Sequence, residues 1–121
     1  MKQKKIYIDI YSYTLYYIDM ESYDDLDEVI KIFKRLDLGQ ENIDDLKTKA
    51  EHEEIGGATT FHKRSTCTLV VLLYPQPSDN RKLECICHEK RHCEDFILET
   101  LDIHDTEAAA YLAGYLAKKI M

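Results

Sequence analysis

The segment TLVVLLYP, residues 68–75, is the sequence feature that most constrains the fold. Five consecutive aliphatic residues stand between Thr68 and Tyr74, and Pro75 and Pro77 follow them closely. A short apolar run that is rich in Val and Leu and closed by prolines predicts the most buried strand of the protein. The preceding ATTFH and the polar turn HKRS predict its hairpin partner, behind Gly56 and Gly57.

In the other segments, apolar residues recur either at every second position, as in a strand, or at helical spacing. Residues 4–19, KKIYIDIYSYTLYYID, alternate with period 2 and predict a hairpin that turns near Ser12 and Tyr13. Helical spacing of apolar residues predicts an amphipathic helix over residues 24–39. Residues 41–54 predict a short exposed helix, and two further helices are expected from about Asp79 to Leu101, behind a Ser78 cap, and from about Asp105 onward.

These elements predict an α+β fold, with a small antiparallel sheet of two hairpins and helices around it. With 121 residues, 45% of them apolar and 32% charged, the chain is expected to form one globular domain over residues 1–121. No export signal and no membrane span is visible, which indicates a cytoplasmic protein with no membrane partner and with four reduced cysteines. A net charge of −7 without a basic stripe argues against a nucleic-acid partner.

The five residues HEKRH, 88–92, match the H-E-x-x-H pattern of zinc hydrolases. On a helix, residues four apart share a face, so His88 and His92 can present both imidazoles to one zinc ion. Zinc lowers the pKa of a bound water to about 7, and Glu89 could accept its proton as a general base. The alternative is a charged helix in which the pattern arose by chance.

A catalytic zinc site usually has three protein ligands, so a third ligand is needed. The glycine and third histidine of metzincins are replaced by Asp95 and Leu98. Glu107 is the better candidate, because the chain after residue 101 is long enough to return it to the histidines; an ordinary acid in a first helical turn is the alternative. His104 is a weaker candidate.

Other residues could take part in such a site. Tyr111, one turn after Glu107, could donate a hydrogen bond to an oxyanion, or it could simply pack. Cys85, Cys87 and Cys93 lack the C-x-x-C spacing and are interpreted as core thiols, with Cys85 on the face of the histidines. The strand 68–74, if it lies at the sheet edge, could pair with an extended peptide. The tyrosines of the N-terminal hairpin favour sheet packing or a partner surface.

HEKRH, a gap of thirteen residues and TEAAAYLAGYL together resemble the H-E-x-x-H and E-A-x-x-aromatic-A-x-x-L signature of ImmA/IrrE-type metallopeptidases. The chain also resembles small H-E-x-x-H proteins of phages and mobile elements, most clearly over residues 56–121. The resemblance implies a zincin-like core, zinc on His88, His92 and Glu107, and Glu89 as general base.

Three functions are therefore open. The first is a cytoplasmic zinc metallopeptidase, encoded by a phage or mobile element, that cleaves a protein or peptide. The second is an inactive, zinc-stapled interaction domain. The third is a metal-free structural domain.

Overall fold

A computed structural model describes all of residues 1–121, and its four strands form one sheet in the order β1-β2-β4-β3. The strands are β1 (Lys2–Ile8), β2 (Tyr13–Asp19), β3 (Ala58–Lys63) and β4 (Thr68–Leu73). Both expected hairpins are present, and Ser12 (φ 54°) and Cys67 (φ 50°) make their connections in the left-handed conformation.

The α+β class is confirmed, but the sheet is not wholly antiparallel. Strands β2 and β4 pair in parallel, with Leu15 opposite Leu69, so that the two antiparallel hairpins join through one parallel contact. Strand β4 consequently lies inside the sheet, where its residues from Leu69 to Leu73 are all buried. The strand could pair with an extended peptide only at a sheet edge, and this condition is not met, because β2 and β3 occupy both of its sides; the edge strands are β1 and β3.

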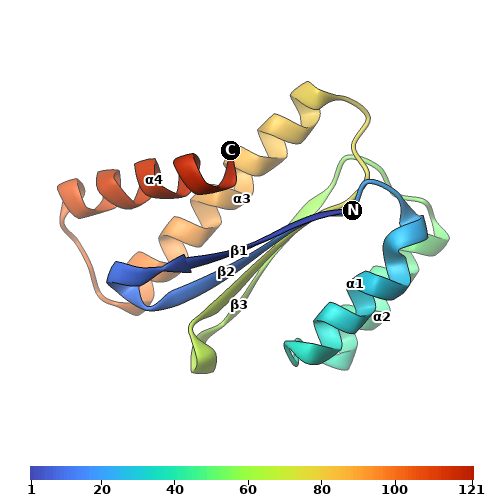
Figure 1. The fold of residues 1–121 in the computed structure, drawn as a ribbon, viewed down its shortest axis with the longest axis horizontal. Helices are drawn as coiled ribbons and strands as arrows, with labels where there is room; N and C mark the ends of the chain where they lie inside the picture. Colours follow the sequence, from blue (N-terminus) through green and yellow to red (C-terminus); the bar gives the residue numbers. More distant parts are fainter.

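Four α-helices cover the two faces of the sheet (Figure 1). They are α1 (Leu26–Arg35), α2 (Gln40–Glu51), α3 (Asp79–Thr100) and α4 (Thr106–Ile120). Helix α2 was expected to be exposed, but two of its residues, Ile43 and Leu46, are buried. None of the helices is both long enough and apolar enough to cross a membrane.

The core has two halves, one on each face of the sheet. Leu15, Leu69 and Val71 face α3 and α4 in one cluster of 14 buried residues. Val70 and Leu72 face α1 and α2 in a second cluster of 11 buried residues. Because successive residues of β4 point to opposite faces, this single strand supplies side chains to both halves.

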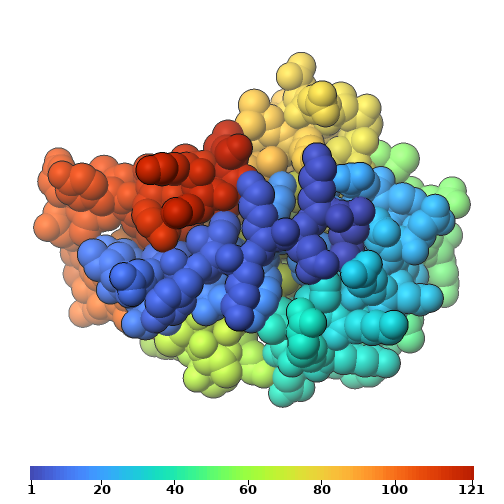
Figure 2. All heavy atoms as spheres, viewed as in Figure 1, coloured from blue at the N-terminus to red at the C-terminus, as the bar shows by residue number.

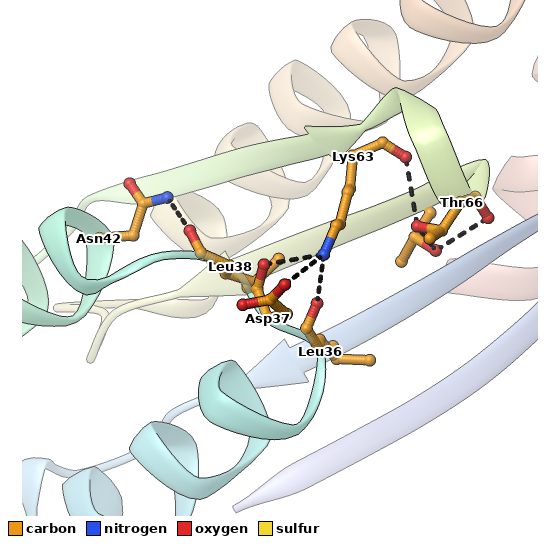
Figure 3. Close-up of polar contacts among 7 residues, drawn as sticks. Leu36, Asp37, Leu38, Asn42, Lys63 and Thr66 are labelled. Carbon is orange, nitrogen blue, oxygen red and sulfur yellow. Dashed lines mark hydrogen bonds and ion pairs between the residues drawn. The ribbon is translucent and has the colours of Figure 1, made fainter.

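A lysine of β3 ties the end of α1 to the sheet (Figure 3). Lys63 Nζ donates to the carbonyl oxygens of Asp37, at 3.0 Å, and Leu36, at 3.4 Å, and lies 3.2 Å from Asp37 Oδ2. Asn42 Nδ2 donates to Leu38 O at 2.7 Å. These bonds satisfy carbonyl groups in the turn after α1, where helical hydrogen bonding ends.

Candidate metal centre

His88 and His92 lie side by side on the exposed surface of α3. Their Nε2 atoms are 3.1 Å apart, and the ring centroids are separated by 4.8 Å with the planes nearly perpendicular. Two nitrogen ligands of a tetrahedral zinc ion, each about 2.05 Å from the metal, would be about 3.3 Å apart. The two imidazoles therefore fit two positions of a zinc coordination shell.

Glu89 is buried beside this pair, with 6% of its surface exposed. Its Oε2 accepts a hydrogen bond of 2.5 Å from Thr60 Oγ1 on β3. Glu89 and His88 both line a hollow of about 390 Å³ at the start of β3, together with Cys85. The carboxylate is thus fixed at one oxygen and borders the same space as one of the two imidazoles.

The position of the histidines follows from the buried stripe of α3. Cys85, Glu89, Cys93 and Ile97 recur every four residues and face the core. His88 and His92 lie on the flank of this stripe towards β3, where His92 and Phe96 have ring centroids 6.4 Å apart. The two imidazoles are therefore at the surface, next to the sheet edge that β3 forms.

Helix α4 lies on the opposite flank of that stripe. Lys90 Nζ donates to Ala113 O of α4 at 3.3 Å and also pairs with the buried Glu94. Arg91 Nη1 lies 3.4 Å from the second oxygen of Glu94. The two basic residues inside HEKRH thus neutralise a buried carboxylate, and Lys90 also attaches α3 to α4.

Glu107 does not join the histidine pair in this structure. It occupies the exposed first turn of α4, where its amide donates to the Asp105 cap at 2.8 Å. No group of three or more His, Cys, Asp or Glu side chains lies together in an arrangement that could hold a metal ion. The pair supplies two ligand positions, and Glu107 is not placed beside it, because α4 packs against the other flank of α3.

The remaining candidates are also placed apart from the pair. Tyr111 is 77% exposed and lines a different cavity, together with the connection between β1 and β2. His104 Nε2 lies 2.6 Å from Asp102 Oδ1 in the exposed loop before α4.

The four cysteines are free thiols. Cys85 borders the hollow beside His88 and donates to Gly56 O at 3.3 Å. Cys93 is fully buried, and this burial, with smaller contributions from the charges of Glu89 and Glu94, raises the pKa of its thiol to about 12. Cys93 therefore keeps its proton at neutral pH, whereas Cys87 is exposed.

Sequence reasoning missed two residues of β3 that face α3, Thr60 and His62. Thr60 holds Glu89, whereas His62 Nε2 lies 2.9 Å from Tyr13 Oη and its ring centroid is 4.8 Å from that of Phe96. Burial, and secondarily the charge of Arg64, lowers the pKa of His62. The period-2 alternation of ATTFHK places Thr60 and His62 on one face, but their helical partners are fixed only by the tertiary packing.

Comparisons with known proteins do not assign this site to a family. No protein-family model, no curated protein and no solved structure matches the chain.

Proposed function

We propose that the protein is a zinc-dependent peptidase of zincin type, with a protein or peptide as its substrate. The observation that supports this best is the pair of imidazole Nε2 atoms 3.1 Å apart on one turn of α3, with the Glu89 carboxylate bordering the hollow that His88 also lines. The cytoplasm is the compartment that fits four free cysteines.

Each residue has a distinct role in this proposal. A zinc ion held by His88 and His92 would supply a Lewis acid that activates water and polarises a carbonyl group. Glu89 accepts a proton at its free oxygen, while the hydroxyl of Thr60 holds the other oxygen in place. Strand β3 is an edge strand next to the histidines, so its outer side is available to pair with an extended peptide.

The third ligand in this proposal is Glu107, and its support is the sequence signature alone. Replacement of Glu107 by Gln removes the charge while preserving the shape of the side chain. If Glu107 is a ligand, the variant loses zinc affinity.

A second candidate function is metal-mediated interaction without catalysis. One observation favours it: the pair is exposed and no third ligand of the same chain lies with it. A partner protein or a second copy of this chain would then complete the coordination shell. In that case Glu107→Gln leaves zinc binding unchanged, and the ion brings two chains together, which the molar mass in solution with and without zinc would reveal.

Cleavage of an unfolded polypeptide tests the peptidase proposal. Wild-type protein, Glu89→Gln, the matched control Glu99→Gln on the exposed side of α3, and chelator-treated protein are incubated with the same substrate. We expect fragments from wild type and Glu99→Gln, and none from Glu89→Gln or the chelated form, because the base or the metal is missing. Equal cleavage by Glu89→Gln would refute Glu89 as the base.

A further inference from the structure

A second cavity, of about 540 Å³, lies between α4 and the single-turn helix η1 (Asp9–Tyr11) that connects β1 to β2. It is distinct from the hollow beside the histidines and shares no residue with it. In Figure 2 the N-terminal hairpin and α4 meet on the viewed face of the molecule. The volume is within the range, roughly 300–1,000 Å³, that is usual for sites of small organic ligands.

The floor of this cavity is fixed by the core. Ile8 is fully buried and Leu112 is 3% exposed, and both belong to the core cluster under α3 and α4. Tyr115 Oη donates to Tyr7 O at 3.1 Å, which fastens α4 to β1. The cavity therefore has a floor of core residues, and one hydrogen bond joins α4 to β1 beside it.

The rim of the cavity consists of apolar side chains that are largely exposed to solvent. Ile10 and Tyr111 are 80% and 77% exposed, the highest values among the large hydrophobic residues of the chain, and both line this cavity. Tyr11, partly buried, completes the aromatic lining. Two such side chains facing one apolar cavity mark a surface that gains stability when a ligand covers it.

Asp9 is the one charged residue that lines the cavity, and it takes part in none of the ion pairs of the protein. A free carboxylate next to tyrosine rings favours a cation, because the carboxylate attracts the charge and the faces of the rings attract it further. Lys119 Nζ lies 5.6 Å from the ring centroid of Tyr115, so that ring already holds an ammonium group, and Tyr11 and Tyr111 are the lining rings left for a ligand. The apolar walls favour a hydrocarbon body on the same molecule.

We propose that this cavity binds a small organic cation with an aromatic or alkyl body, with its ammonium group at Asp9 and its body against Tyr11 and Tyr111. The site is independent of the histidine pair and of any activity there.

A charge series with one hydrocarbon body tests this site. The probes are phenethylammonium, the neutral 2-phenylethanol and the anionic 3-phenylpropionate, titrated into the full chain and followed by NMR shifts. We expect saturable shifts for residues 8–11 and 111–115, and affinity for the ammonium at least about fivefold higher than for the alcohol. No binding of the carboxylate is expected.

Two variants separate charge from shape. Asp9→Asn should abolish the preference for the ammonium over the alcohol, and Tyr111→Ala should weaken both, with little effect on folding because the side chain is exposed. The matched control is Asp27→Asn on α1, across the sheet, which should change nothing. The proposal is overturned if wild type binds the ammonium and the alcohol equally well, or if Asp9→Asn keeps the preference for the ammonium. It is also overturned if the NMR shifts occur at other residues, or if no shift saturates below about 10 mM of probe.

Discussion

Thr60 Oγ1 on β3 lies 2.5 Å from Glu89 Oε2 on α3, and this hydrogen bond joins the edge strand to the helix that contains both histidines. It also satisfies one oxygen of a carboxylate that is 6% exposed. A buried carboxylate without such a partner is costly, so the bond contributes to stability as well as to the position of Glu89.

Replacement of Thr60 by Val removes the hydroxyl and keeps the β-branched shape. We expect the free energy of unfolding to fall by about 1–2 kcal/mol, because one buried carboxylate oxygen loses its donor. Urea denaturation measures the change, with Thr106→Val in the exposed first turn of α4 as the control. A stability equal to that of wild type would show that the bond has no energetic role.

Replacement of Lys63 by Met tests the attachment of α1 to β3. The ammonium group bonds two carbonyl oxygens and Asp37 Oδ2, while the Asp37 side chain is 90% exposed, so the ion pair itself contributes little. We expect a loss of about 1 kcal/mol, chiefly from the carbonyl bonds. Lys47→Met, at an exposed position of α2, is the control and should unfold at the wild-type urea concentration.

The cysteines should differ sharply in reactivity. At pH 8 iodoacetamide should alkylate the exposed Cys87, whereas Cys93, whose buried thiol has a pKa raised to about 12, should react only after unfolding. Mass spectrometry of the alkylated peptides measures both rates. Rapid alkylation of Cys93 in the folded protein would contradict its burial.

The raised pKa of Cys93 also predicts how stability changes with pH. The unfolded thiol, with a pKa of about 9, releases its proton earlier than the folded one, at about 12. The stability contribution is therefore complete below pH 9 and declines as the pH rises towards 12. Chemical denaturation at pH 8 and pH 10.5 should show a smaller decline for Cys93→Ala than for wild type.

Local patterns in the sequence predicted most of the elements. The helix expected from about Asp79 to Leu101 is α3, and Ser78 caps it by accepting a hydrogen bond from the Arg81 amide at 3.1 Å. The two hairpins follow from alternation and turn residues, which are local properties. The parallel pairing of β2 with β4 was not predictable in this way, since it depends on how two separate hairpins meet.

The candidate site was predictable to the same extent. Spacing along one helix was enough to place His88 beside His92, because both belong to a single element. The position of Glu107 depends on the flank of α3 against which α4 packs, and the bond from Lys90 to Ala113 O lies on the flank away from the histidines. The spacing of residues along the sequence does not determine which flank of α3 packs against α4.

Zinc affinity of the histidine pair is the most direct test of the central claim. Competition with a chromophoric chelator gives the affinity of wild type, His88→Ala, His92→Ala and the control His52→Ala at the exposed end of α2. The account predicts stoichiometric binding by wild type and His52→Ala, and its loss in both pair variants. Wild-type affinity in His88→Ala, or an equal loss in His52→Ala, would contradict a metal centre at His88 and His92.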